Sequence, residues 1–327
     1  MCSNASITEI LGINDRNLVI LGNEKENIKG IEYTVLRGKL SYRRRKNYLP
    51  RVLSIDEFKS VNTVDASMSV NLTDLEGGHI FDILVDRRQR YLFEYFNSYP
   101  LKVRKRVEYV TTDMYKPYID LAKKVFPNAN IVVDKFHIVQ LMTRELNKLR
   151  INEMKKLNTR SREYKILKRY WKIPLAKNCE LNRIYFYKNR HFKNMTSSID
   201  ILDYMLKEFP NLKEAYDFYQ NFLLSISNND VAMLEDIINT RTDKIPMCFR
   251  KSIKSLKKLR KYVLNSLKYD YTNAMVEGKN NKIKVIKRVS YGYRSFRNFK
   301  ARIMLMERYK IQKGNIHSYQ FAMDTAA

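Results

Sequence analysis

Three acidic residues stand where carboxylates can act together on a phosphate. Asp56 follows the apolar run Val52–Ile55, Asp113 follows the run Val110–Thr112, and Glu277 lies in the helical pattern Thr272–Lys287. Phosphoryl transfer by two divalent cations requires oxygen ligands that converge on one point, with the cations about 3.5–4 Å apart. Strand ends hold such ligands rigidly. The three residues therefore form a candidate two-metal site, provided that the fold brings them together.

Each of these acids also has an ordinary structural role open to it. An aspartate at a strand end usually belongs to a turn or a cap, and a glutamate on a basic helix usually belongs to an i, i+4 ion pair. Taken one at a time, none of the three identifies a catalytic site. The prediction depends on the order of the elements that must position them.

The first of these elements are strands. Residues 51–90 predict three strands joined by short turns, which is typical of an antiparallel meander: Arg51–Ile55, Ser67–Leu72 and His79–Val85. The pattern then alternates between helix and strand, with a helix over Tyr91–Tyr99, a strand over Val107–Thr112, a helix that begins at Pro117 and a strand over Ile131–Val133. The order strand, helix, strand predicts parallel pairing beside the meander.

Strand signals mostly end after Ile138, and helical spacing dominates up to Tyr271, apart from a short apolar run at Ile184–Tyr187. Met142–Lys156 and Ser252–Leu267 are the clearest examples of that helical spacing. The last block reads as helix, aromatic turn and helix. This order predicts an α/β protein with a ribonuclease-H-like (retroviral-integrase-like) mixed-sheet core and a large all-α insertion before the last core helix.

The charge of the chain indicates a polyanionic partner. The 327 residues contain 62 Lys and Arg against 34 Asp and Glu, a net charge of +28. Neutralising nucleic-acid phosphates releases counterions, so such an excess favours nucleic-acid binding. Ribosome-associated and low-GC bacterial proteins are also often rich in lysine, so charge alone does not decide the partner. The sequence shows no basic amphipathic anchor segment, so a membrane surface is the weaker interpretation of the charge.

The cysteines and the apolar runs exclude several classes of protein. Cys2, Cys179 and Cys248 form no C-x-x-C pair, so neither a zinc ribbon nor a disulfide framework is indicated. Reduced thiols are the simplest account of them, and we expect a cytoplasmic, nucleoid-associated protein. The sequence contains no run of about 18 apolar residues, so no membrane span is predicted. The first residues lack a signal-peptide pattern.

Four stretches carry a family resemblance. They read L-S-I-D-E-F-K-S at 53–60, D-M-Y-K-P-Y at 113–118, F-P-N-A-N-I-V-V-D-K-F-H-I-V at 126–139 and N-A-M-V-E-G-K-N-N-K-I-K-V-I-K-R-V-S-Y-G-Y at 273–293. In this order, over roughly residues 50–310, the chain resembles the ISL-three family of bacterial insertion-sequence transposases. The resemblance implies a DDE enzyme that cuts and joins double-stranded DNA with two Mg²⁺ or Mn²⁺ ions, with Asp56, Asp113 and Glu277 as catalytic acids and metal ligands.

Two further residues belong to the family pattern. Asp134 and His137 resemble the C/D-x-x-H unit that follows the second acid in related transposases and marks the entry to the helical insertion. Asp134 also follows an apolar strand, so it is the rival of Asp113 for the role of second acid. His137 is either a locally bonded residue at a helix start or a residue that acts near the DNA.

The basic residues around Glu277 are the candidate DNA contacts. Beside a metal site, such charges would hold phosphates on either side of the cut, although a solvated helix face is the alternative. The candidates are Lys279, Asn280, Asn281, Lys282, Lys284, Lys287, Arg288, Arg294 and Arg297. Within the insertion, Arg169–Lys172 and Arg183–Arg190 interleave aromatic and cationic residues. That pattern suits either stacking on distorted or single-stranded DNA or helix packing with exposed cationic ends.

The N-terminal segment departs from the family pattern. Residues that resemble the lead-in to the family's zinc motif are followed almost at once by Tyr48-Leu49-Pro50, so the zinc-binding and helix-turn-helix parts are missing. We expect a remnant segment at 1–49, a catalytic core at 50–139, the insertion at 140–270, the final catalytic helix region at 271–313 and a tail at 314–327. The expected function is transposition, by a dimer on DNA. The alternatives are an inactive remnant that binds only DNA or a partner, and a host-type ribonuclease-H-like nuclease.

Overall fold

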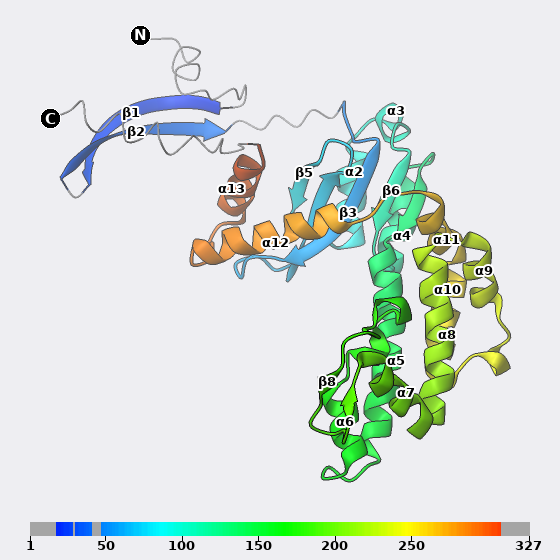
Figure 1. Ribbon diagram of the computed structural model, residues 1–327. Coiled ribbons are helices and arrows are strands. Elements are labelled where there is room, and N and C mark those ends of the chain that lie inside the picture. The colour runs from blue at the N-terminus through cyan, green and yellow to red at the C-terminus, as the bar shows by residue number, and fades with distance from the viewer. Residues whose placement is uncertain (1–17, 29, 41–46, 309–327) are drawn as a thin grey trace.

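A five-stranded mixed sheet forms the centre of the protein (Figure 1). The structure is a computed structural model that describes residues 18–28, 30–40 and 47–308. The strands lie in the order β5-β4-β3-β6-β7. Their bounds are β3 Val52–Lys59, β4 Met68–Asp74, β5 His79–Leu84, β6 Tyr109–Thr112 and β7 Asn130–Val133.

The predicted pairing of the strands is confirmed. β3, β4 and β5 pair antiparallel, whereas β6 pairs parallel to β3 and β7 pairs parallel to β6. Short turns can only reverse the chain, and the parallel strands need crossover helices. The crossovers contain α2 (Gln89–Asn97), α3 (Leu101–Arg104) and α4 (Lys116–Val125). β3 is therefore central, and its neighbours on the two sides run in opposite directions.

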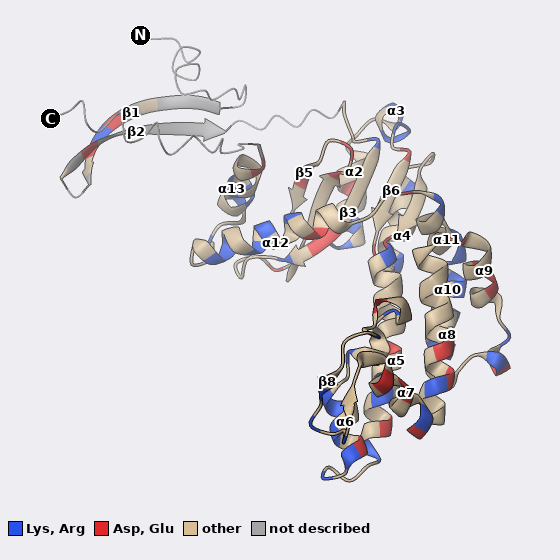
Figure 2. Cartoon of the chain, in the orientation of Figure 1, with Lys and Arg blue, Asp and Glu red and all other residues tan. Residues whose placement is uncertain are grey.

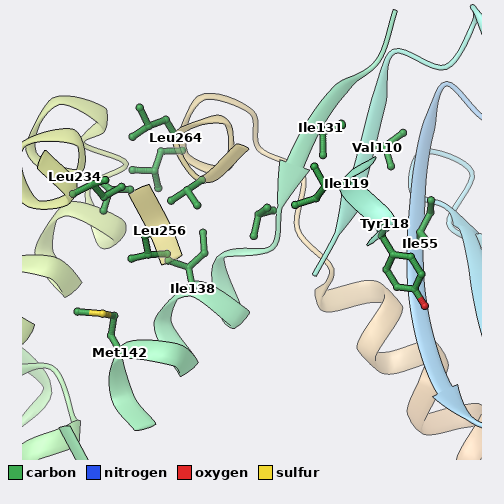
Figure 3. Close-up of a cluster of buried hydrophobic side chains, with 14 of the residues drawn as sticks. Ile55, Val110, Tyr118, Ile119, Ile131, Ile138, Met142, Leu234, Leu256 and Leu264 are labelled. Carbon is green, nitrogen blue, oxygen red and sulfur yellow. The ribbon is translucent and has the colours of Figure 1, made fainter. Parts of the chain in front are cut away.

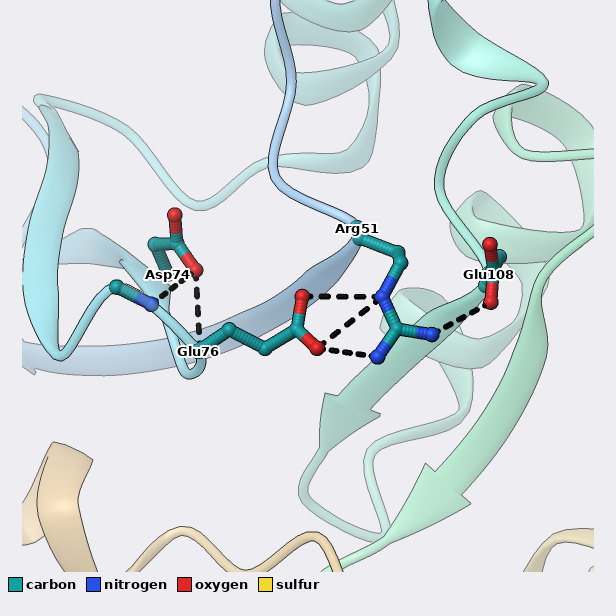
Figure 4. A network of polar contacts seen from close by, with 5 residues as sticks. Arg51, Asp74, Glu76 and Glu108 are labelled. Atoms are coloured by element: carbon teal, nitrogen blue, oxygen red, sulfur yellow. Dashed lines mark hydrogen bonds and ion pairs between the residues drawn. The ribbon is translucent and has the colours of Figure 1, made fainter.

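The end of the sheet at which β3 begins is joined by ion pairs (Figure 4). Arg51 precedes β3 and pairs with Glu76 in the β4–β5 turn and with Glu108, which precedes β6. In the same turn, Asp74 Oδ1 accepts backbone N–H groups of Glu76 and Gly77, at 3.1 and 2.9 Å. Because Arg51 and its partners are about half exposed, these pairs define the geometry more than they stabilise the fold.

The two faces of the sheet have different coverings. On one face, α2 and α4 cover the alternate residues Leu53, Ile55 and Val110 of the main core. On the other face lie α12 (Ala274–Val289) and α13 (Phe296–Arg308). There a second cluster joins β3 and β5 to the final helices: Phe58, Val61, Ile80, Ile83, Ile283, Ile286, Phe299, Ile303 and Met304. The sheet is thus the middle of three layers (Figure 1).

The helical region follows β7. It begins with α5 (Lys135–Lys155) and continues through α6 (Arg162–Arg169), α7 (Ser198–Glu208), α8 (Pro210–Ser227), α9 (Val231–Asn239), α10 (Arg250–Lys258) and α11 (Arg260–Lys268). It also contains short 3-10 turns and a small pair of strands, β8 (Tyr187–Lys188) and β9 (Met195–Thr196). The helical region is therefore all-α, as expected, except for the strand pair β8 and β9. This exception lies beside the apolar run Ile184–Tyr187, which interrupts the helical spacing of the sequence.

The pattern over Ser252–Leu267 predicted one helix, and the structure has two. The chain leaves helical geometry at Leu259, between α10 and α11. α10 and α11 both pack against α5 and α9, and α11 also packs beside β7, where Asn265 Nδ2 donates to the carbonyl of Ile131 at 2.9 Å. The bend at Leu259 therefore lets the second half of the pattern reach the sheet.

A single hydrophobic core runs from the sheet into the helical region (Figure 3). Ile55 and Val110 of the sheet belong to the same buried cluster as Met142 on α5 and Leu256 on α10. Because this cluster is continuous, α5 is anchored to the sheet at its first turns.

An N-terminal hairpin precedes the sheet. β1 (Leu18–Ile28) pairs antiparallel with β2 (Ile31–Leu40). Gly30 has φ +85° in the turn, and its N–H donates to Asn27 Oδ1 at 2.9 Å. Both strands lie within residues 1–49, the expected remnant segment. The expected tail at 314–327 lies outside the described residues, and so does part of the expected remnant at 1–49. Among the described residues, no helix is both long and apolar enough to cross a bilayer.

Candidate active site

Three aspartates form a row across the carboxyl ends of the parallel strands. In the register of the sheet, Ile55 pairs with Thr112 and Thr112 pairs with Val133. The next residues along these strands are Asp56, Asp113 and Asp134, and the N–H of Asp134 donates to the Thr112 carbonyl at 3.1 Å. Residues in register point to the same face of a sheet. Asp113 is therefore the middle member of the row, with Asp56 on one side and Asp134 on the other.

Asp56 lies within β3 and is partly buried. Its Oδ1 accepts the N–H of Glu57 at 2.7 Å, and its Oδ2 accepts Asn280 Nδ2, also at 2.7 Å. Burial, followed by the negative charge of Asp113, raises the pKa of Asp56 to about 6. A carboxylate that is costly to ionise, beside a second carboxylate, is a position at which a cation would be stabilising.

Asp113 contacts a histidine from the insertion. His137 lies on the first turn of α5, and its Nε2 lies 2.8 Å from Asp113 Oδ1. The hydrogen bond to Asp113 raises the pKa of His137. The structure thus places this residue of the D-x-x-H unit against an acid of the row.

Asp134 has a different environment. It precedes α5 and is buried, and its Oδ1 accepts the N–H of Asn273 at 3.4 Å. Burial raises the pKa of Asp134. This contact ties the end of β7 to the residue that immediately precedes α12.

The helix α12 lies across the row and is fixed at two points. Asn273 Oδ1 accepts the hydroxyls of Ser54 at 3.2 Å and of Thr111 at 2.8 Å. Two turns later, Asn280 donates to Asp56 and accepts Asn71 Nδ2 at 3.0 Å. Asn273 and Asn280 are seven residues apart, so they lie on the same face of the helix.

Glu277 lies between these two fixed points, at i+4 from Asn273 and i−3 from Asn280. It therefore shares the face that meets the sheet, and its side chain is exposed. In the described part of the chain, no three His, Cys, Asp or Glu side chains gather closely enough to hold a metal ion. The structure thus brings Asp56 and Asp113 together and places Glu277 on the facing helix.

Sequence reasoning missed the asparagines that assemble the site. Asn71 on β4, Asn273 and their hydroxyl partners form a buried polar layer beneath the acids. Asn71 Oδ1 in turn accepts the Thr73 hydroxyl at 3.1 Å. The seven-residue spacing of Asn273 and Asn280 around Glu277 was a visible signal, because it predicts one shared helix face.

The predicted DNA-contact residues have several different environments. Asn280 is buried against Asp56. Lys279 and Lys282 both pair with the buried Glu307 of α13, and Lys287 Nζ donates to the Ser60 carbonyl. Figure 2 shows basic residues spread along α12. The remaining candidates, on α12 and after it, are exposed: Asn281, Lys284, Arg288, Arg294 and Arg297.

Comparison with known proteins identifies the family. Residues 53–303, most of the chain and all of the site, match a family model described as transposase, of the ISL-three DDE group. The chain belongs to this transposase family. This confirms the resemblance carried by the four sequence stretches.

A curated relative has a different description. The transposase chain is 29% identical over 197 residues to a protein of Lactococcus lactis subsp. lactis called "ATP-dependent protease". The matched region covers 59% of this chain and 62% of that protein, so the chain spans less than two thirds of its relative.

The donor set of the transposase site suits hard divalent cations. Transposases act on DNA, and DDE transposases generally use divalent metal ions. Asp56 and Asp113 offer carboxylate oxygens from adjacent rigid strands, and oxygen ligands are the ones that Mg²⁺ prefers. Burial and the charge of Asp113 raise the pKa of Asp56, and a bound cation would offset both effects. Asp56 and Asp113 therefore supply part of the oxygen ligand set for the cations that the family implies, and among the described residues no third ligating side chain gathers with them.

Proposed function

We propose that this protein is the catalytic region of a DDE transposase, which cleaves DNA strands and joins them in the transposition of an insertion sequence. The observation that carries the proposal is the adjacency of Asp56, within β3, and Asp113, which directly follows β6, beneath the helix that bears Glu277. The strand order β5-β4-β3-β6-β7 and the insertion before α12 support a ribonuclease-H-like core. The domain boundaries at 50, 140, 271 and 314, and a dimer on DNA, are parts of the same proposal.

The roles of the residues follow from their contacts. Divalent cations, when bound, would activate the attacking water or 3′-hydroxyl and stabilise the leaving oxygen. Asp56, Asp113 and Glu277 would hold these cations. Asn280 and the Glu57 amide each occupy one lone pair on a different oxygen of Asp56. Each carboxylate oxygen has two lone pairs, so both oxygens keep one for a ligand while the rotamer is fixed.

Asp113 is a better candidate for the second catalytic acid than Asp134. Asp113 is adjacent to Asp56 in the row and contributes to the raised pKa of Asp56. Asp134 lies one strand farther away and accepts the amide that precedes α12. We therefore assign Asp134 to positioning α12, and His137 to holding Asp113 Oδ1.

The test is cleavage of DNA that carries the element's ends, with Mg²⁺ or Mn²⁺. Asp56→Asn, Asp113→Asn and Glu277→Gln should each lower the rate by more than the roughly 10–100-fold that loss of an outer-shell partner causes. Asp134→Asn should stay within that range. The exposed Asp65 of the β3–β4 loop gives a matched control, because Asp65→Asn changes a carboxylate that no role is assigned to. Activity that is unaffected by the first three changes would reject the assignment.

The same assay distinguishes an active transposase from the alternative, an inactive remnant that only binds DNA. A remnant would bind the ends but release no cleaved strand with either cation, and Asp56→Asn would bind as wild type does. The name of the Lactococcus relative suggests another class of enzyme, one that needs a nucleotide site. The motif G-x-x-x-x-G-K-S/T, which forms one such site, does not occur in these 327 residues.

A further inference from the structure

A strip of apolar side chains lies in solvent at the small strand pair of the insertion. Ile184, Tyr185, Phe186 and Tyr187 are 78, 67, 52 and 54% exposed. We call these four residues the aromatic strip. Four consecutive large apolar residues rarely remain uncovered on a monomer, and such patches mark interaction sites. The aromatic ring of Phe299 on α13, in contrast, is fully buried.

The backbone under the strip is held by two asparagines. Asn182 Oδ1 accepts the N–H groups of Ile184 and Tyr185, and Asn182 Nδ2 donates to the Tyr185 carbonyl at 2.6 Å. At the other end, Asn189 Nδ2 donates to the carbonyls of Tyr187 and Thr196. The strip is therefore presented by a fixed backbone, and a ligand would not have to order it.

The surroundings of the strip are strongly basic. Residues 160–193 contain eleven Lys and Arg but only two acids, Glu163 and Glu180. Figure 2 shows basic residues gathered around α6 and β8. The pKa of His191 is lowered, by burial first and then by the positive charges of Arg169 and Arg190. A second copy of this face would meet the same charges, which opposes two-fold self-association through it.

We propose that the aromatic strip binds unpaired bases of the DNA on which the protein acts, with its cations along the phosphates. The inference rests on the proposed function. Exposed aromatic rings interleaved with cations grip single strands, because every base has a face for stacking. In duplex DNA the bases stack on one another, so only the phosphates are accessible to this surface.

The strip lies far from the acids along one rigid helix. α5 begins beside the catalytic row and has 21 residues, and α6 packs against its later part (Figure 1). At 1.5 Å per residue, the helix spans about 30 Å. That length corresponds to about nine nucleotides of duplex rise at 3.4 Å each. The strip would therefore contact bases about one helical turn away from the cleavage point.

The experiment measures binding without catalysis. The full chain carrying Asp56→Asn is titrated, in EDTA, against a labelled 16-nucleotide oligothymidylate and a labelled 16-base-pair duplex, and anisotropy is followed. Adding Tyr185→Ala, Phe186→Ala and Tyr187→Ala should weaken single-strand binding by about five- to a hundredfold, the size of stacking losses. Duplex binding should change less than about twofold, because the phosphate contacts remain.

Two control variants make the result decisive. Tyr185→Phe with Tyr187→Phe keeps the rings and should retain single-strand affinity. Phe93→Ala removes a 39% exposed aromatic ring from α2 and should change neither affinity. Equal losses on both DNAs, no loss on either, or loss only of self-association in sedimentation would each overturn the proposal. Since no metal is present and Asp56 is already replaced, failure here leaves the catalytic assignment untouched, and failure of the cleavage test leaves this binding result standing.

Discussion

Asp56, the proposed first acid, illustrates at the scale of one residue how a group in a candidate site can cost stability. Its pKa of about 6 lies above the ordinary value, so the folded protein holds that proton more tightly than the unfolded chain does. The stabilisation is full at pH values below about 4, and it is lost as the pH rises through about 6. At neutral pH in the absence of metal, Asp56 therefore destabilises the fold.

Asp56→Asn should increase the stability of the metal-free protein at pH 7.5 by about 1–3 kcal/mol and should have little effect at pH 4. The new side-chain amide at position 56 can be accommodated. If the side-chain amides of Asn280 and Asn71 flip, each hydrogen bond from position 56 through Asn280 to Asn71 again joins a donor to an acceptor. Urea unfolding in EDTA at both pH values measures the difference. A variant less stable than wild type at pH 7.5 would contradict the raised pKa.

Asn280 and Asn281 are neighbours that the structure separates. Both were predicted to contact DNA, but Asn280 is buried between Asp56 and Asn71, whereas Asn281 is exposed. Asn280→Ala should cost about 1–3 kcal/mol, because it leaves buried polar partners unsatisfied. It should also raise the metal concentration needed for half-maximal cleavage, since Asp56 loses the contact that fixes it.

The control for that prediction is Asn281→Ala, which should leave stability and the metal requirement unchanged. DNA affinity should be the same for Asn280→Ala and wild type when measured by anisotropy without metal. If Asn280→Ala instead weakened DNA binding and left the metal requirement alone, a positioning role would be excluded.

At the scale of elements, the pair α12–α13 is held to the sheet by a buried ion-pair group. Glu307 of α13 is 3% exposed and binds Lys279 and Lys282 of α12. It also accepts the Ile80 N–H of β5 at 3.3 Å. Burial acts to raise the pKa of Glu307, but the two lysines outweigh burial, so the pKa is lowered. The stabilisation is therefore present at neutral pH and is lost as the pH falls.

Glu307→Ala should destabilise the protein by about 1–3 kcal/mol, because it removes the acceptor of Lys279 and of the Ile80 N–H. Glu94→Ala breaks the exposed pair with Arg90 on α2 and should change stability by less than about 0.5 kcal/mol. Thermal unfolding followed by circular dichroism compares the two. Equal effects of the two changes would show that Glu307 is not the anchor that its burial indicates.

The sequence predicted elements better than contacts. The meander, the parallel strands and the final helices follow from local periodicity, which needs no knowledge of neighbours. The bend at Leu259 and the roles of Asn71, Asn273 and Asn280 depend on which element packs against which. Asn280 and Asn281 have the same side chain and neighbouring positions, so only the orientation of α12 over β3 distinguishes a buried hydrogen bond from an exposed amide.

At the scale of the whole molecule, the protein has a net charge of +28. Some of its cationic side chains are paired with acids, and others are exposed to solvent. Arg288, Arg294 and Arg297 are exposed around the end of α12, whereas Lys279 and Lys282 are paired with Glu307. The exposed arginines are therefore the better candidates for phosphate contacts.

Replacing Arg288, Arg294 and Arg297 with alanine should weaken duplex binding and reduce the slope of log affinity against log salt by about 0.9 for each lost contact. Anisotropy titrations over a range of salt concentrations measure the slope. Lys254→Ala with Lys258→Ala on the exposed side of α10 is a charge-loss control, which should leave the slope close to that of wild type. A slope changed as much by the control would mean that only net charge matters.

The separation of the site along the chain sets a time for its assembly during synthesis. Asp56 and the Asn280 that fixes it are 224 residues apart. At about 5–20 residues per second, the ribosome needs roughly 10–45 s to reach Asn280 after making Asp56. Until α12 emerges, the nascent chain carries two of its acids but cannot complete the site. Under the proposed function, translation therefore delays DNA cleavage until most of the protein has been made, and a message truncated within the helical region yields a product that lacks the complete site.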